Sequence, residues 1–103
     1  MSAIQHITYA ELQDWRAAGE DFQLIDVREP EEHEAYNIGG ELIPLGDLLQ
    51  QQEKIDAEKP VVFYCKRGIR SQIAIQRLAQ KFPGAAFFNL QGGILHLRST
   101  PME

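Results

Sequence analysis

Cys65 is the only cysteine in the chain and the residue best suited to nucleophilic chemistry. It directly follows a strand-like apolar run, residues 61–64, and precedes a helix expected at about residues 71–82. Unpaired backbone N–H groups and the helix dipole favour negative charge at the start of a helix. The sequence therefore predicts that Cys65 is a reactive thiolate.

The loop that follows Cys65 is basic and contains a glycine. Lys66, Arg67 and Arg70 place three positive charges close together in a chain whose net charge is −5. Gly68 permits backbone conformations that turn successive N–H groups towards an anion. Most free cysteines are small buried hydrophobic residues, but an inert core cysteine gains nothing from a cationic loop. We therefore interpret the loop as a cradle around a nucleophilic sulfur.

Two chemistries use a single cysteine in such a loop: phosphate-ester hydrolysis through a phosphocysteine, and sulfur transfer through a persulfide. Only four residues separate Cys65 from Arg70, one fewer than in the signature of cysteine-dependent tyrosine phosphatases. Tyr64 precedes the cysteine, where that signature often has His. The spacing favours sulfur transfer and leaves a phosphatase or arsenate reductase relative as the weaker alternative.

Strand-like and helix-like segments alternate along the chain, which is typical of an α/β fold with a largely parallel sheet. The expected strands are residues 4–7, 22–27, 41–44, 61–64 and 86–90, and the expected helices begin near residues 8, 30, 47, 71 and 94. Thr8 and Glu11 have the spacing of a capping box. A helix over residues 47–55 is expected to bury Leu48 and Leu49.

Three segments resemble the motifs of single-domain rhodaneses, a family of sulfurtransferases. FYCKRGIRS (63–71) resembles their Cys-x-x-Gly-x-Arg-Ser active-site loop, LIDVREPEE (24–32) a second signature, and LQGGI (90–94) a C-terminal one. The matches follow the family's order and spacing over nearly the whole chain. The resemblance implies a rhodanese-like three-layer fold, with a mostly parallel five-stranded sheet and helices on both faces.

The resemblance also implies roles for individual residues. Cys65 would be the catalytic sulfur carrier. The loop that binds the substrate and stabilises the persulfide would comprise Lys66, Arg67, Gly68, Ile69, Arg70 and Ser71. Asp26 and Arg28 match the family's Asp-x-Arg and would support this loop, although an ion pair that only organises the strand end is an equally good interpretation.

Three positions depart from the family pattern outside the cysteine loop. Asn37 lies in the segment that is usually Gly-His-Ile, His33 replaces a common aromatic residue, and Leu97 stands where many members have Trp. Residues 40–44 are also one residue short. We expect these differences to change local packing rather than chemistry.

Composition narrows the possible functions. With 103 residues, 44% of them hydrophobic, we expect one domain over residues 1–103, with residues 99–103 as a frayed tail. The net charge of −5 argues against nucleic acid or an anionic membrane as partner.

No stretch approaches the roughly 18 apolar residues of a membrane span, so we expect a cytoplasmic protein. We also expect the protein to be a monomer. A lone cysteine cannot form a disulfide within the chain, and the three histidines do not have the spacing of metal ligands. We expect neither a metal site nor a cofactor.

The predicted reaction has two steps. The Cys65 thiolate takes the outer sulfur of thiosulfate or a similar donor, and the persulfide passes it to cyanide or to a thiol, including that of a thioredoxin-like protein. A sulfur-carrier module that serves a partner protein is the main alternative, and an inactive interaction domain is a weaker one. We expect the pKa of Cys65 to lie below the ordinary thiol value, because the N–H dipoles and the cations Lys66, Arg67 and Arg70 favour the thiolate.

Overall fold

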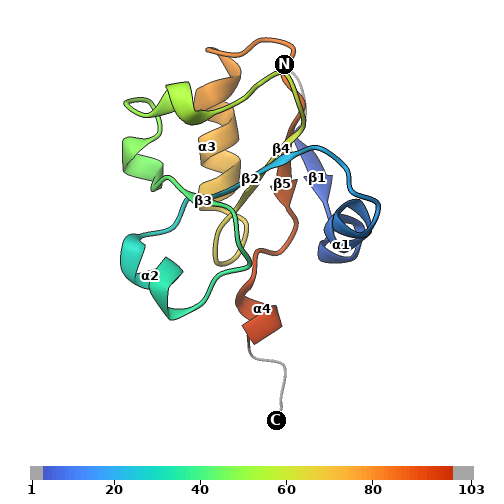
Figure 1. The fold of residues 1–103 in the computed structure, drawn as a ribbon. Coiled ribbons are helices and arrows are strands. Elements are labelled where there is room, and N and C mark those ends of the chain that lie inside the picture. Colours follow the sequence, from blue (N-terminus) through green and yellow to red (C-terminus); the bar gives the residue numbers. More distant parts are fainter. Residues whose placement is uncertain (1–3, 99–103) are drawn as a thin grey trace.

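The computed structural model describes residues 4–98, so the tail expected at residues 99–103 lies outside the described range. Five strands form one sheet in the order β1-β5-β4-β2-β3, and each pairing between neighbours is parallel (Figure 1). The strands are β1 (Gln5–Ile7), β2 (Gln23–Asp26), β3 (Glu41–Leu42), β4 (Val61–Tyr64) and β5 (Phe87–Leu90). The predicted five-stranded parallel sheet is confirmed.

Helices cover both faces of the sheet, as predicted. The helices are α1 (Tyr9–Ala17), α2 (Pro30–Ala35), α3 (Arg70–Ala79) and α4 (Leu95–Arg98), with 3₁₀ turns η1 (Leu45–Asp47) and η2 (Gln52–Lys54). Figure 1 shows α3 and the two 3₁₀ turns on one side of the sheet and α1 on the other. The result is a three-layer α/β fold.

Strand β4 lies at the centre of the sheet and supplies both halves of the core. All four of its residues are buried, which explains its unbroken apolar sequence. Because successive side chains of a strand point to opposite faces, Val61 and Phe63 pack in the cluster beneath α3, whereas Val62 and Tyr64 pack with Leu12 of α1. The strand that ends at Cys65 is therefore held from both sides.

Helix α1 begins at the capping box predicted from Thr8 and Glu11. Thr8 Oγ1 accepts a hydrogen bond from the Glu11 backbone N at 3.1 Å, and Glu11 Oε1 accepts one from the Thr8 backbone N at 2.9 Å. These contacts satisfy two N–H groups that a helix start leaves without partners.

The helix predicted for residues 47–55 is wrong, because this segment forms η1 and η2 with turns between them. Leu48 is buried as expected, but Leu49 is 45% exposed. The apolar residues here are too few and too irregularly spaced to give a helix a continuous buried face. Leu48 and Ile55 instead enter the core beneath α3 separately, one from each turn.

Candidate active site

Cys65 follows β4 directly, and its sulfur lies inside the loop that leads into α3. Sγ accepts hydrogen bonds from the backbone N of Gly68 at 3.1 Å and of Ser71 at 3.4 Å, and lies 3.4 Å from Ser71 Oγ. Gly68 has a φ of 90°, a conformation that L side chains rarely adopt. The N-cap residue of α3, Ile69, provides no side-chain hydrogen bond. The sulfur therefore serves as the acceptor that an N-cap side chain normally supplies.

The protonation of Cys65 reflects two opposing effects. Burial is the largest single effect and raises the pKa of the thiol. The hydrogen bond between Sγ and the Ser71 side chain, together with those from the backbone N–H groups of Ser71, Arg67 and Gly68, outweighs it, so that the pKa lies below the ordinary thiol value. The direction agrees with the prediction, and the causes that lower the pKa are the hydrogen bonds to the sulfur.

The turn after β5 holds the cysteine loop by its backbone. The backbone N of Ile94 donates to the carbonyl of Cys65 at 3.1 Å, and the backbone N of Leu95 donates to that of Lys66 at 3.0 Å. Gly93 has a φ of 66°, and a Cβ at this position would collide with the backbone of Lys66. The Gly-Gly-Ile sequence thus permits a close approach that a larger residue would prevent.

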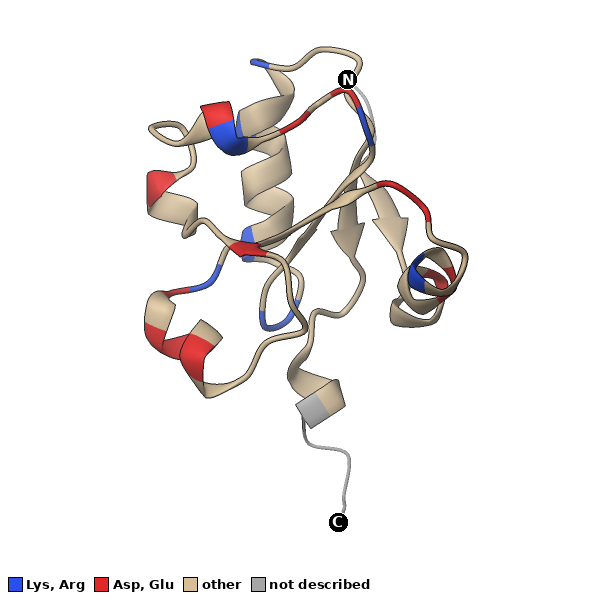
Figure 2. Cartoon of the chain, in the orientation of Figure 1, with Lys and Arg blue, Asp and Glu red and all other residues tan. Residues whose placement is uncertain are grey.

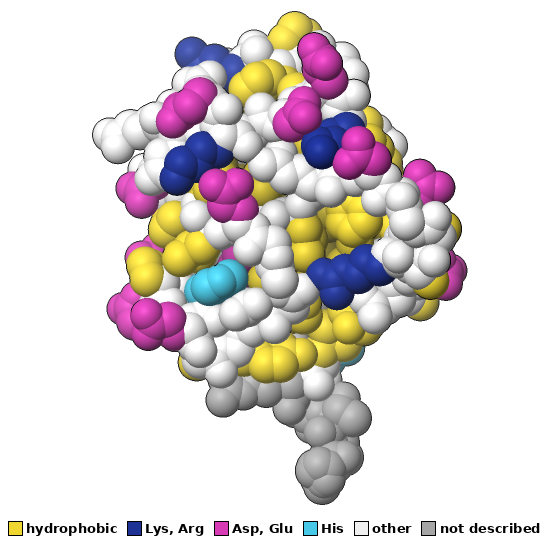
Figure 3. Space-filling view, in the orientation of Figure 1, with side chains coloured by type: hydrophobic (Ala, Val, Ile, Leu, Met, Phe, Trp, Pro, Cys, Tyr) yellow, Lys and Arg dark blue, Asp and Glu magenta, His cyan; other side chains and the backbone are white. Residues whose placement is uncertain are grey.

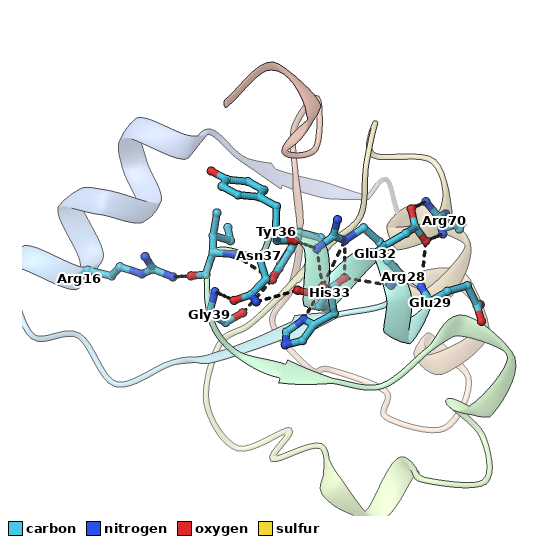
Figure 4. Close-up of polar contacts among 12 residues, drawn as sticks. Arg16, Arg28, Glu29, Glu32, His33, Tyr36, Asn37, Gly39 and Arg70 are labelled. Carbon is cyan, nitrogen blue, oxygen red and sulfur yellow. Dashed lines mark hydrogen bonds and ion pairs between the residues drawn. The ribbon is translucent and has the colours of Figure 1, made fainter. Parts of the chain in front are cut away.

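Arg70 points towards α2, where it forms a two-pronged ion pair. Its Nη1 lies 2.7 Å from Glu32 Oε1 and its Nη2 lies 3.0 Å from Glu32 Oε2 (Figure 4). The hydrogen bond from Arg70 is the main cause that lowers the pKa of Glu32 to about 2. The sequence placed Glu32 in the segment 24–32 but did not reveal its pairing with Arg70. The charge of Arg70 is therefore largely compensated.

The other residues predicted for the loop differ in their exposure to solvent. Lys66 and Arg67 are exposed, as is Ile69 at 64%, whereas Ser71 is fully buried. Figure 2 shows the basic loop between β4 and α3 next to the acidic helix α2. On the face seen in Figure 3, basic side chains are separated by acidic ones.

Asp26 and Arg28 form a buried ion pair at the end of β2. Arg28 Nη2 lies 2.8 Å from Asp26 Oδ2 and also donates to the carbonyl of Tyr36 at 2.6 Å. His33 Nδ1 lies 2.8 Å from the same Asp26 oxygen (Figure 4). These contacts anchor α2 to the sheet, which supports the interpretation of an organising ion pair.

Asn37 and Tyr64 stabilise the segment that follows α2. Asn37 donates to the carbonyl of His33 at 2.9 Å and accepts from the Gly39 backbone N at 2.8 Å. The Tyr64 hydroxyl donates to the carbonyl of Gly39 at 2.8 Å, and burial is the main cause that raises its pKa to about 12. His33 and Asn37, two of the departures from the family pattern, thus make local hydrogen bonds that hold this segment.

A cavity of about 300 Å³ opens beside the cysteine loop, between α2 and the start of α4. Its lining includes Arg28, Glu32, Tyr36, Lys66, Ile94 and Leu95. The cavity gives a small molecule or an extended peptide a place next to the loop.

Asn89 is a further buried polar residue near the sulfur, and its role was not predicted from the sequence. Ser71 Oγ donates to Asn89 Oδ1, and Asn89 Nδ2 lies 3.1 Å from His6 Nδ1. Hydrogen bonds thus connect Cys65, through Ser71, to strand β1.

The part of the chain from residue 4 to residue 98 contains no group of three or more His, Cys, Asp or Glu side chains arranged to hold a metal ion. Within that part, no helix is long and apolar enough to span a bilayer.

Comparison with known proteins places this geometry in a family. The model of the rhodanese-like domain matches residues 8–99. The Bacillus subtilis protein YqhL is 43% identical over 82 residues, covering 79% of this chain and 64% of YqhL. The adenylyltransferase and sulfurtransferase MOCS3 of Drosophila persimilis is 34% identical over 79 residues, covering 69% of this chain and 18% of MOCS3.

A solved structure supports the same assignment. The rhodanese-like domain protein from Staphylococcus aureus superposes with a TM-score of 0.79 at 25% identity, covering 88% of each chain. The protein belongs to the rhodanese-like family, and MOCS3 is one of its sulfurtransferase-named relatives. The chain spans less than two thirds of the length of YqhL and about a fifth of MOCS3.

Proposed function

We propose that this protein is a sulfurtransferase that carries a sulfane sulfur on Cys65 as a persulfide. One observation carries the proposal: Sγ accepts hydrogen bonds from the backbone N–H groups of Gly68 and Ser71. Neutral donors stabilise a thiolate while leaving its charge available for attack. Because Cys65 is buried, only small sulfur donors can reach it. A single reduced cysteine is also compatible with the reducing environment of the cytoplasm.

The reaction proceeds through two displacements at sulfur. The Cys65 thiolate attacks the outer sulfur of thiosulfate, forming an S–S bond while the bond to the sulfonate sulfur breaks and its electron pair leaves with sulfite. A cyanide ion or a thiolate then attacks the outer persulfide sulfur, and the S–S electron pair returns to Cys65. Lys66 and Arg67, both exposed, attract the dianionic donor to the loop.

Intact mass spectrometry after incubation with thiosulfate tests the first step. We expect a gain equal to one sulfur atom in the wild-type protein, reversed by cyanide, and no gain in Cys65→Ser. Serine is nearly isosteric, so the control retains the fold but lacks a thiolate. Sulfur loading of a folded Cys65→Ser protein would contradict the assignment of the carrier.

The acceptor distinguishes an independent enzyme from a carrier that serves a partner protein. The exposed Ile69 beside Lys66 and Arg67 gives the loop an apolar and cationic rim that suits contact with another protein. Loaded protein should be mixed with cyanide, a small thiol or reduced thioredoxin, and the loss of the added sulfur should be timed. Faster unloading by protein thiols favours the carrier role.

A phosphatase activity is the remaining alternative, because phosphatases also use a cysteine cradle. We expect hydrolysis of an aryl phosphate to be negligible compared with thiosulfate-dependent transfer, since Arg70 is held by Glu32 and the loop is one residue shorter than the phosphatase loop. Comparable turnover of both substrates would favour the phosphatase assignment.

A further inference from the structure

A hydrogen-bonded row of four side chains connects the reactive sulfur with the edge of the sheet. Cys65 Sγ lies 3.4 Å from Ser71 Oγ, Ser71 contacts Asn89, and Asn89 Nδ2 lies 3.1 Å from His6 Nδ1. Cys65, Ser71 and Asn89 are buried, whereas His6 is exposed on β1. The parallel register of β1 and β5 places His6 directly opposite Asn89.

The direction of the hydrogen bonds in this row matters because Ser71 has only one hydroxyl proton. In the observed arrangement the Ser71 hydroxyl donates to Asn89 Oδ1. Ser71 Oγ can then only accept a hydrogen bond from Cys65, which favours the thiol form. Ser71 stabilises the Cys65 thiolate only when its hydroxyl proton turns towards Sγ.

The Asn89 amide decides between these two directions. A half-turn of the amide exchanges Oδ1 and Nδ2, so that Nδ2 donates to Ser71 Oγ and the hydroxyl proton is free for Cys65 Sγ. Asn89 Oδ1 then faces His6 Nδ1, which must carry a proton to donate. Two complete arrangements exist, one with Nδ1 of His6 unprotonated and one with it protonated.

We propose that Asn89 and His6 are positioning residues that set the direction of the Ser71 hydroxyl and so couple a proton on His6 Nδ1 to the thiolate of Cys65. Imidazole suits this role because it has two ring nitrogens and changes its charge between about pH 5 and 8. The coupling favours the Cys65 thiolate, which is the form that attacks the sulfur donor. Its functional value therefore rests on the proposed sulfur transfer.

The charged groups that face His6 come from α1. Glu11 and Asp14 line a shallow depression of about 210 Å³ together with His6. From β5, the uncharged Asn89 contacts His6 and Phe88 lines the same depression. Both carboxylates are present in every variant compared below, so their effect on His6 is common to all of them.

Nuclear magnetic resonance of the ring nitrogens tests the coupling. The protonation of His6 Nδ1 is followed against pH, the ionisation of Cys65 is followed by the ultraviolet absorbance of its thiolate, and His96 serves as an internal control in the same spectra. We expect the Nδ1-protonated forms of His6 to be favoured about fivefold by the thiolate, the effect of one hydrogen bond. His96 should not respond. A ratio of Nδ1-protonated to Nδ1-unprotonated His6 that is the same with the thiol and with the thiolate would overturn the proposal.

Two variants break the row at different links. In Asn89→Leu the protonation of His6 should no longer follow Cys65, while Ser71 can still donate to the sulfur. Ser71→Ala cuts the next link with a smaller change of volume, so it provides the test if Asn89→Leu does not fold. If His6 still follows Cys65 in these variants, the coupling acts through space rather than through Asn89. Because no sulfur donor is used, these results are independent of whether sulfur is transferred.

Discussion

Two hydrogen-bonded clusters lie at the carboxyl edge of the sheet, and they hold negative charge in different ways. At the end of β4, the Cys65 sulfur is held by neutral donors from Gly68 and Ser71. At the end of β2, the Asp26 carboxylate is paired with the Arg28 guanidinium. A buried ion pair neutralises its own charge and organises structure, whereas neutral donors leave the charge available. We therefore assign the proposed chemistry to the first cluster and structural support to the second.

Removing one partner of the ion pair should give the largest effect. Asp26→Ala leaves Arg28 buried without its counter-charge, and we expect a loss of about 3–5 kcal/mol in the free energy of unfolding. Denaturant unfolding measures it. In the matched control, Asp26→Leu combined with Arg28→Met, most of the stability should return, because no charge remains buried. If Asp26→Ala were as stable as the wild type, the ion pair would not be needed to organise the end of β2.

Gly93→Ala should disturb the loop around Cys65 by displacing the backbone of Lys66. The added Cβ would collide with the backbone of Lys66, and the φ of 66° disfavours any residue with a side chain. We expect a loss of about 1–3 kcal/mol in stability and at least a tenfold loss in sulfur loading, measured by the rate of persulfide formation. Gly84→Ala is the matched control, because Gly84 has a φ of 84° but nothing within 4 Å of the added Cβ. Equal effects of the two substitutions would mean that conformation, not the contact with the loop, is responsible.

Ser71→Ala should change the sulfur while leaving the ion pair intact. The variant retains the backbone N–H to Sγ but lacks the hydroxyl, whose hydrogen bond lowers the pKa of the thiol when its proton points at Sγ, so we expect the pKa of Cys65 to rise. Thiolate absorbance against pH measures the change. Ser71→Thr keeps a hydroxyl and should leave the pKa closer to that of the wild type. A falling pKa in Ser71→Ala would contradict the role of the hydroxyl as a donor.

Glu32→Gln should give the smallest and most pH-dependent effect. The pKa of Glu32 is lowered from 4.5 to about 2, so its contribution to stability is present above pH 4.5 and is lost as the pH falls towards 2. We expect the variant to be about 1 kcal/mol less stable than the wild type at pH 7, because the pair is partly exposed. The difference should vanish near pH 2 in denaturant titrations. A difference independent of pH would assign the loss to packing rather than to charge.

The sequence predicted features that depend on neighbouring residues. The unbroken apolar run of β4 identified the central strand, and a glycine with three cations after Cys65 identified the loop. The helix over residues 47–55 failed because Leu48, Leu49 and Ile55 were read as one buried face, whereas Leu49 is exposed.

Contacts between distant residues could not be predicted from the sequence alone. Glu32 meets Arg70 across 38 positions, and His6 meets Asn89 across 83. Such pairs are decided by strand order and register, and a polar residue on a strand does not reveal its partner. The ion pair of Arg70 was missed for this reason: its charge was visible in the sequence, but its pairing with Glu32 was not.

The place of β1 in the sheet affects the order in which the fold assembles. Within residues 4–98, β1 has β5 as its single neighbour in the sheet, so the first strand of this range pairs only with its last. During synthesis, β1 must remain unpaired until residues 87–90 have left the ribosome, and closing a loop of this length carries an entropic cost that local contacts do not. The contact between His6 and Asn89 therefore forms only once β1 has docked, and a nascent chain that lacks β5 exposes the edge of β1 to other chains.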